Sequence, residues 1–291
     1  MKFSINFMKY RKIFLTISAV LMAGSLLFLL IKGLNLSIDF TGGNVITVKL
    51  SESEKVSVGE VREVVGKVLE ANPMIQEYGE TAFIIRTQDD GDDARNEMLK
   101  ALKMKYPEMV TLGIDKVGPV VGAELRHEAY VSMVIALVAI LLYITFRFQF
   151  RFAIVSVAAL VHDTVLVIGA FSLAGMEVNT TFIAAILTVV GYSINATIII
   201  LDRVRENWKD LPSKKIVQLV NDSTNQTLSR TINTTLTTVC PVIALFVWGG
   251  PVLSSFSFAL LIGLIVGTYS SICISTSLLC AWWIKKPIAK R

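Results

Sequence analysis

Six long stretches of mostly apolar residues divide the chain. A helix needs about 20 such residues to cross a hydrocarbon core of about 30 Å. The stretches are Ile13–Ile31, Ala129–Phe146, Phe152–Ala174, Thr181–Leu201, Thr231–Trp248 and Phe256–Ile284. The fifth is diluted by threonines, whose hydroxyls can bond back to their own helix. The pattern therefore predicts an all-α polytopic membrane protein with six transmembrane helices.

The segment between the first two stretches, residues 33–128, has a different pattern and a mixed charge. Its order reads strand, helix, strand, strand, helix, strand, which is the split βαβ or ferredoxin-like arrangement. The expected elements are Val45–Val48, Ser57–Leu69, Met74–Tyr78, Thr81–Thr87, Asp92–Tyr106 and Val110–Val117. Ser57 and Glu60 form a capping-box pattern, and Gly79-Glu80 marks a hairpin turn. We expect an α+β ferredoxin-like (βαββαβ) domain that binds or transmits motion.

Charge gives the chain an orientation. The net charge is +5, and Lys and Arg gather before the first stretch, in alternate loops and at the end of the chain. The loops Gly175–Thr180 and Gly249–Ser255 contain neither residue. The positive-inside rule then predicts that both termini are cytoplasmic, and the basic residues mark topology rather than a nucleic-acid partner.

The resulting layout has four parts. Residues 1–32 are the cytoplasmic N-terminus and a retained first span, and residues 33–128 are the extracytoplasmic domain. Residues 129–284 are the bundle of spans two to six, with a cytoplasmic loop over 202–229, and residues 285–291 are a cytoplasmic tail. Within the loop, Ile216–Leu228 is amphipathic. It could lie along the inner membrane surface or belong to the protein interior.

Four glycine-rich or polar motifs stand at the ends of the spans. They are Asp39-Phe40-Thr41-Gly42-Gly43, Val117–Leu125 with Gly118, Pro119 and Gly122, Gly191–Thr197 running on to Asp202-Arg203, and Gly249-Gly250-Pro251. Glycine lets the backbone turn sharply, so the first two motifs can act as hinges between membrane and domain. An ordinary turn between span and strand explains Gly42-Gly43 equally well.

Ionisable residues inside the spans are the strongest functional candidates, because burying a charge at that depth costs about 2.5–3.5 kcal/mol on insertion scales. Asp163 lies near the middle of span three beside His162 and is expected to relay protons or pair helices, rather than to be a satisfied polar residue. Adjacent helix residues point apart, so His162 is a weaker candidate. Arg230 either snorkels to the interface or joins a polar stripe into the bundle. Asp202 and Arg203 are expected to form a helix-end cluster.

Taken in order over the whole chain, the spans, the domain and the four motifs resemble the SecF family of protein-export subunits, within the RND superfamily of proton-driven transporters. The resemblance implies half of an RND-type core that pairs with SecD in a bacterial cytoplasmic (inner) membrane. It implies that the pair assists the SecYEG channel and uses protons to draw the translocating unfolded polypeptide outward. A functional arginine is implied at Arg230. Neither a cofactor nor a metal is implied.

The chain departs from that family at one position. The resemblance implies an aspartate where this chain has Ala196, and the comparable acid of SecD would fall on Asn195. Alanine cannot exchange a proton, so proton coupling is expected to be impaired. Either Ala196 is an engineered substitution, the favoured explanation, or the chain is a natural member that couples through Asp163 or through SecD alone.

Three other functions compete. An RND-type exporter of lipids or small molecules usually carries more spans and two outer domains, and a scaffold subunit without energy coupling would need no acid at position 196. An intramembrane serine hydrolase would use Ser193 with His162, but Ser193 lies among small polar residues that suit helix packing. We expect no enzymatic activity. The spacing of cysteine and histidine also predicts no metal site.

Overall fold

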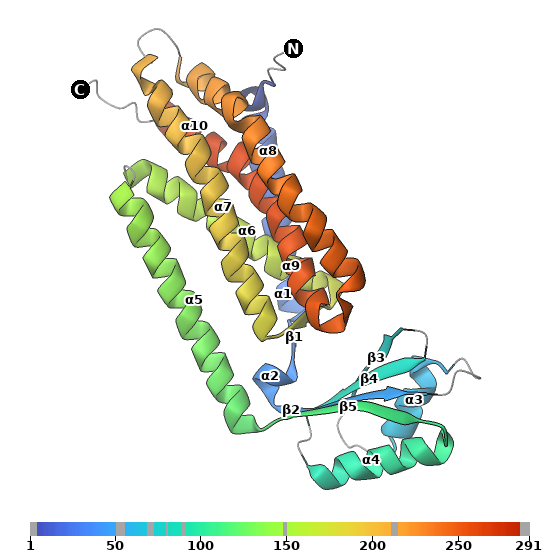
Figure 1. The fold of residues 1–291 in the computed structure, drawn as a ribbon. Coiled ribbons are helices and arrows are strands. Elements are labelled where there is room, and N and C mark those ends of the chain that lie inside the picture. The colour runs from blue at the N-terminus through green and yellow to red at the C-terminus, as the bar shows by residue number, and fades with distance from the viewer. Residues whose placement is uncertain are drawn as a thin grey trace. The chain divides into compact units, whose positions relative to one another are not determined.

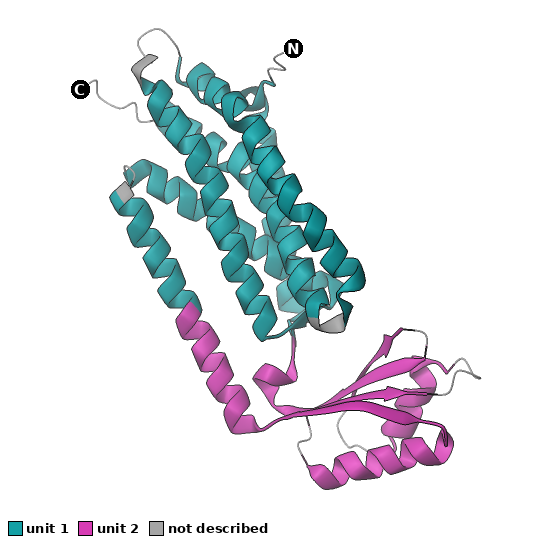
Figure 2. Cartoon of the chain, viewed as in Figure 1, with its two compact units in different colours: residues 1–35, 133–291 teal, residues 36–132 magenta. Residues whose placement is uncertain are grey.

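The computed structural model describes residues 5–50, 56–68, 73–79, 81–88, 91–147, 150–210 and 215–285. These form two compact units, residues 1–35 with 133–291 and residues 36–132 (Figure 2). Several predicted features lie outside the described residues. They are Leu69 at a helix end, Glu80 in the hairpin turn, residues 211–214 of the loop and residues 286–291 of the tail.

Among the described residues, six helices are long and apolar enough to cross a membrane, which confirms the predicted spans (Figure 1). The helices are α1 (Arg11–Lys32), α5 (Pro119–Arg147), α6 (Phe150–Ala174), α7 (Thr180–Glu206), α8 (Ile216–Trp248) and a last span made of α9 (Gly250–Tyr269), η3 (Ser270–Ser275) and α10 (Thr276–Lys285). Short 3₁₀ turns η1 (Phe7–Tyr10) and η2 (Asn207–Asp210) precede α1 and follow α7. A two-stranded sheet joins β1 (Asn35–Leu36) and β6 (Glu177–Val178).

Helices α6 and α9 form the interior of the helical unit. α1 packs along α6, and α7 and α8 both pack against α9. Small residues allow these close approaches, because a Cβ at Gly169 would lie 2.3 Å from the Ser25 side chain and one at Gly263 would lie 2.2 Å from Val189. The helices α1, α5 and α8 are far less covered by the chain itself. In the most apolar stretch of α1 and of α5, only 6 % of the residues are buried, and in that of α8 only 11 % are buried.

The predicted cytoplasmic loop over residues 202–229 is mostly helical. α7 continues to Glu206, and Ile216–Leu228 is the first part of α8 rather than a separate helix on the membrane surface. Leu219 and Val220 are buried in the unit. The polar residues on the same face also find partners, since the Asn221 side chain accepts a hydrogen bond from the backbone N–H of Met8 at 3.3 Å. Both kinds of contact favour the interior.

In its described residues, the second unit, which we call the outer unit after its predicted position, is a four-stranded antiparallel sheet with two longer helices and one short helix. In chain order its elements are α2 (Ile38–Thr41), β2 (Gly43–Lys49), α3 (Val58–Val65), β3 (Met74–Tyr78), β4 (Ala82–Thr87), α4 (Asp92–Lys105) and β5 (Val110–Val117). The strand order is β3-β4-β2-β5, and every neighbouring pair is antiparallel. That is the topology of the predicted split βαβ arrangement. Its core joins strand residues such as Ile46 and Ile85 to helix residues such as Val61, Met98 and Leu102.

The start of α3 has the capping box that the sequence predicts. The Ser57 hydroxyl accepts from the backbone N–H of Glu60 at 3.3 Å, and the Glu60 carboxylate accepts from the backbone N–H of Ser57 at 2.9 Å. These bonds to the carboxylate hold the pKa of Glu60 below its ordinary value. The short helix is thereby fixed at the end where its N–H groups lack helical partners.

Replacing Ser57 with alanine should therefore destabilise the outer unit by about 1 kcal/mol, the usual cost of losing an N-cap side chain. The measurement is urea unfolding of the full-length protein in detergent, followed by limited proteolysis of the outer unit. Ser57→Thr keeps a capping hydroxyl and should retain most of the stability. Equal losses in both variants would contradict the capping assignment.

Candidate functional site

A buried carboxylate on α6 is the centre of the polar structure inside the helical unit. Asp163 is 1 % exposed. Its Oδ2 accepts hydrogen bonds from the Ser193 hydroxyl of α7 at 2.5 Å and from the Ser270 hydroxyl of η3 at 2.7 Å. Its Oδ1 lies 2.8 Å from Nδ1 of His162. One side chain therefore connects α6, α7 and the last span.

The expectation that His162 and Asp163 point apart is wrong. The two side chains meet because Nδ1 is the ring nitrogen nearer to the backbone of His162, so it can contact the carboxylate of the next residue. The other nitrogen, Nε2, is buried and has no hydrogen-bond partner in the part of the chain that the structure describes. The imidazole lies 6.3 Å from the ring of Tyr269, whose hydroxyl donates to the Phe14 carbonyl and lies 3.2 Å from the Ser18 hydroxyl of α1.

The last span changes its winding next to Asp163. Residues Ser270–Ser275 form a π-helical segment between α9 and α10. Within it, the Ser271 hydroxyl donates to the Ser193 carbonyl at 3.3 Å and lies 2.9 Å from the Thr197 hydroxyl. π-Helical segments inside α-helices are frequent at functional sites, because the extra residue per turn re-aims side chains. Here the segment presents two successive serines toward α6 and α7.

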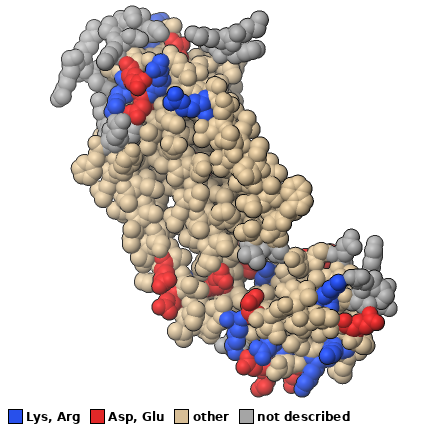
Figure 3. Space-filling model, viewed as in Figure 1, with Lys and Arg blue, Asp and Glu red and all other residues tan. Residues whose placement is uncertain are grey.

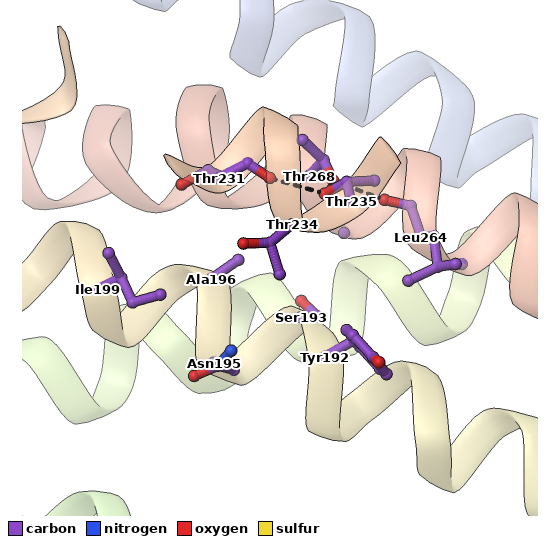
Figure 4. Close-up of a pocket in the computed structure, with 12 residues that line it drawn as sticks. Tyr192, Ser193, Asn195, Ala196, Ile199, Thr231, Thr234, Thr235, Leu264 and Thr268 are labelled. Atoms are coloured by element: carbon purple, nitrogen blue, oxygen red, sulfur yellow. Dashed lines mark hydrogen bonds between the residues drawn. The ribbon is translucent and has the colours of Figure 1, made fainter. Parts of the chain in front are cut away.

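A small pocket lies beside Ala196, between α7, α8 and α9 (Figure 4). Its volume is about 20 Å³, which is room for about one water molecule. It is lined by Tyr192, Ser193, Asn195, Ala196, Ile199, Thr231, Thr234, Thr235, Gly263, Leu264, Gly267 and Thr268. The Thr235 and Thr268 hydroxyls lie 2.7 Å apart across the helices. Ser193 thus contacts the pocket and also donates to Asp163.

The structure places Arg230 away from this pocket. Arg230 lies on α8, is exposed and does not line the pocket; α8 contributes Thr231, Thr234 and Thr235 instead. Its guanidinium makes no hydrogen bond or ion pair with any residue among those described. Asn195 is exposed and Ala196 is half-buried. Position 196 therefore faces hydroxyl groups rather than a cation.

Asp202 and Arg203 belong to a cluster of charges at the end of α7, where blue and red side chains gather in Figure 3. Arg203 Nη1 pairs with Glu206 at 2.8 Å, and Arg205 pairs with Asp202 at 3.3 Å. Arg203 Nε also donates to the Gln226 side chain of α8 at 2.5 Å. The cluster joins the ends of two helices, and exposed pairs of this kind contribute little stability each.

The motif glycines of the outer unit are close-packing positions as well as turns. Gly42 and Gly43 have φ values of +74° and +131°, which disfavour side chains. A Cβ at Gly43 would lie 2.1 Å from the Thr87 carbonyl, and one at Gly122 would lie 3.0 Å from the backbone nitrogen of Gly42. The first turn of α5 therefore sits directly against the Asp39–Gly43 segment.

The remaining motif residues of this unit are Gly118, Pro119 and Asp39. Gly118 has an ordinary φ and open space around it, so the connection from β5 to α5 does not depend on its being glycine. A Cβ at Gly42 would lie 3.1 Å from Cα of Pro119, which places Pro119 in the same close contact as Gly122. Asp39 lies in α2, and its backbone N–H donates to the capping hydroxyl of Ser37 at 3.1 Å.

The geometry also bears on the alternatives of hydrolysis and metal binding. Ser193 meets the carboxylate of Asp163, while His162 meets the other carboxylate oxygen, so the carboxylate lies between serine and histidine. In a hydrolase triad the histidine lies between them and takes the serine proton. Within the described ranges, no three His, Cys, Asp or Glu side chains gather as a metal site.

Sequence reasoning missed Ser270 and Tyr269. The signal was present as a run of hydroxyl residues in an apolar span, Ser270-Ser271 followed by Ser275-Thr276-Ser277. A row of small polar residues in a span usually marks helix packing. The sequence pattern does not reveal that a π-helical segment begins at Ser270, the residue that donates to Asp163.

Comparison with known families gives matches over nearly the whole chain. Residues 97–286 match the family "Protein export membrane protein SecD/SecF, C-terminal", and residues 27–54, which contain Gly42 and Gly43, match "SecD/SecF GG Motif". The protein translocase subunit SecF of Calditerrivibrio nitroreducens is 38 % identical over 99 % of this chain and 96 % of its own length. SecF of Haemophilus influenzae is 38 % identical over 94 % of this chain and 84 % of its own length.

A solved structure agrees with the fold. The crystal structure of SecDF, described as a translocon-associated membrane protein from Thermus thermophilus, superposes with a TM-score of 0.88 at 38 % identity. The match covers 96 % of this chain and 38 % of the SecDF chain. SecDF in a super-membrane-facing form matches with a TM-score of 0.74. This chain therefore corresponds to less than half of that longer polypeptide.

Gly43→Ala should disrupt the outer unit, because the added methyl group would overlap the Thr87 carbonyl at a φ that alanine rarely adopts. We expect a loss of at least about 2 kcal/mol of stability. Gly113→Ala is a matched control on the neighbouring strand β5, where nothing lies within 4 Å and φ is ordinary. Thermal unfolding of both full-length variants is the measurement, and similar midpoints for the two would contradict the close-packing assignment.

Proposed function

The chain belongs to the SecD/SecF family of protein-export membrane proteins, and from this membership we propose that it uses the proton gradient to draw polypeptides out of a SecYEG-type channel. It is a SecF-type protein translocase subunit with six membrane helices. The observation that carries the proposal is the match to SecF relatives over almost the full length of both chains. The site inside the helical unit supplies chemistry that suits proton use.

The proposed partner is a SecD-type protein. The match covers 38 % of the SecDF chain, and we propose that SecD-type helices supply a region equivalent to the remainder. The apolar faces of α1, α5 and α8 support this, because few of their residues are buried within the chain. Helix faces of this kind contact lipid or another helical protein. α1 and α5 are the main candidates for the contact, since only 6 % of the most apolar stretch of each is buried.

The outer unit is proposed to act as a lever on the polypeptide. β5 ends at Val117 and α5 begins at Pro119, so one residue joins strand and helix. Close packing of Gly122 against Gly42 stiffens this junction. A shift of α5 would therefore be passed to the sheet. By the positive-inside rule, the unit lies outside the cytoplasmic membrane of a bacterium and both termini lie inside.

Proton coupling is proposed to depend on the polar residues of the helical unit. Asp163 is buried among hydroxyl donors, whereas Ala196 stands where the family resemblance implies an aspartate, beside Asn195 on α7. Arg230 carries the positive charge of α8 near the pocket-lining Thr231. Without the acid at position 196, we expect weak coupling.

A scaffold subunit that assists export without proton coupling is the second candidate, and Ala196 is the observation that favours it. An enzymatic role is not proposed, because the Ser193 hydroxyl meets a carboxylate rather than an imidazole base. Export of lipids or small molecules is less well supported than polypeptide export, since the matched relatives are protein translocase subunits.

Ala196→Asp should restore proton coupling, because it places an ionisable carboxylate in the hydroxyl-lined pocket. We expect it to raise export severalfold in energised vesicles that contain a SecD-type partner, with the gain abolished by an uncoupler. Ala196→Asn is the matched control, since it has the same shape and cannot carry a proton. Equal export by the two variants, or a gain that survives the uncoupler, would count against proton coupling at this position.

Asp163→Asn should weaken export more than Asp202→Asn. Asparagine removes charge-assisted hydrogen bonds from the buried site, each of which is worth about 1.5–3 kcal/mol, so a loss of about tenfold or more is expected. Asp202 lies in a partly exposed helix-end cluster, where ion pairs are worth about 1 kcal/mol or less. The same vesicle assay compares them, and the reverse order would remove Asp163 from the coupling site.

A further inference from the structure

We propose that the pocket beside Ala196 holds a water molecule that passes protons through Ser193 to Asp163, so that Asp163 is the proton-binding carboxylate of this chain. The inference rests on the proposed use of the proton gradient and deepens it. It assigns the proton to a different helix from the one that carries position 196. It also gives Ser193 the role of a relay.

The pocket has the size and the groups that a water molecule requires. About 20 Å³ suffices for one water, and residues that carry hydroxyl groups line the pocket from three helices: Ser193 from α7, Thr231 from α8 and Thr268 from α9. Thr231 is 2 % exposed, and its hydroxyl makes no hydrogen bond with any described residue. A buried hydroxyl without a partner costs free energy. A small movement that brought this hydroxyl to the pocket would let a water pair with it.

Ser193 connects the pocket to Asp163. It precedes Ala196 by three residues, which places the two on the same face of α7, one turn apart. It lines the pocket and donates to Asp163 Oδ2 at 2.5 Å. Gly267 of α9 allows the approach, since a Cβ there would lie 3.1 Å from Cβ of Ser193. The hydroxyl is thus the side chain shared by the pocket and the carboxylate.

Asp163 has the surroundings of a group that takes up a proton. Two hydroxyls and His162 Nδ1 converge on it, and it pairs with no Lys or Arg among the described residues. The elements packed against α6 also carry Tyr269 on α9, Cys273 in η3 and Cys280 on α10. Their charged residues stand toward the ends of the helices, at Arg11, Lys12 and Lys32 on α1 and at Asp202, Arg203, Arg205 and Glu206 on α7, and Tyr192 of α7 is exposed. α1 and α7 present Ser18 and Ser193 there. Because no fixed cation balances the carboxylate, a mobile proton can.

The transfer is a simple relay in which only O–H bonds change. A hydronium ion in the pocket gives a proton to Ser193 Oγ, and the hydroxyl proton of Ser193 passes to Asp163 Oδ2. One O–H bond breaks and one forms at each step, water is released, and Ser193 ends as a neutral hydroxyl. The net change is one proton gained by the carboxylate.

Protonation changes the hydrogen bonds that Asp163 can accept and donate. Oδ2 accepts from both Ser193 and Ser270 before transfer, but a protonated Oδ2 also has a proton to donate. Ser270 has an alternative acceptor, since its hydroxyl lies 3.1 Å from the Gly267 carbonyl. Its bond can move there when Asp163 takes the proton. The π-helical segment η3, which begins at Ser270, is therefore the element that responds.

The experiment follows the proton on the full-length protein in lipid, without any export assay. Infrared spectroscopy after a rapid drop in pH records the carbonyl band of a protonated carboxyl group. We expect a band that Asp163→Asn lacks, and its rate of appearance should fall about tenfold or more in Ser193→Ala. Ser193→Thr keeps the hydroxyl and should keep the rate. Ser156→Ala is a matched control, because Ser156 is a buried α6 serine with no described partner.

The outcomes are separable from those of the proposed function. A band that persists in Asp163→Asn, or an unchanged rate in Ser193→Ala, would overturn the inference. A slowed rate in Ser156→Ala equal to that in Ser193→Ala would also overturn it, because the effect would then be general. If the infrared results hold while export in vesicles ignores the uncoupler, the relay stands and the proposed proton-driven function fails.

Discussion

An ionised or ionisable carboxylate can remain at the depth of Asp163 only if polar partners replace the water that it has lost. The membrane interior offers none, so the protein must bring them from neighbouring helices. Ser193 arrives from α7, and Ser270 arrives from a segment whose winding differs from the rest of its helix. Packing of small residues between α6, α7 and α9 follows from this requirement, since bulky residues would hold the donors too far away.

Much of this architecture could be predicted from the sequence. Hydrophobic length alone located the six spans, and the pattern of the outer unit predicted the order in which its strands and longer helices follow one another along the chain. The capping box at Ser57 was visible because it is local. Asp163 was recognisable because placing a carboxylate inside an apolar span costs on the order of 3 kcal/mol of free energy. Each of these features depends on a few neighbouring residues or on the spacing of apolar residues along the chain, so a single sequence is enough to predict it.

Other features could not be predicted, because they depend on how distant segments meet. The contact of His162 with Asp163 contradicts the simple rule for adjacent helix residues. Ser270 donates to the carboxylate from the start of a π-helical segment, which the sequence pattern does not reveal. The sequence left open whether Arg230 joins a polar stripe into the bundle, and the pocket beside Ala196 receives Thr231 and Thr234 instead, since one helical position decides which side chain turns inward. The first part of α8 fitted the membrane surface and the protein interior equally well, and the contacts of its polar residues with η1 and η2 favour the interior.

The length of α8 has a consequence for communication across the membrane. Its 33 residues extend about 50 Å at 1.5 Å per residue, which exceeds a hydrocarbon core of about 30 Å. One continuous rod therefore carries the threonines of the pocket within the bilayer and, beyond it, the glutamine that receives Arg203. Gln226 and Thr231 are five residues apart on this rod, so the contact with Arg203 and the lining of the pocket belong to one stretch of helix. A tilt of α8 at the pocket therefore also strains its contact with the end of α7.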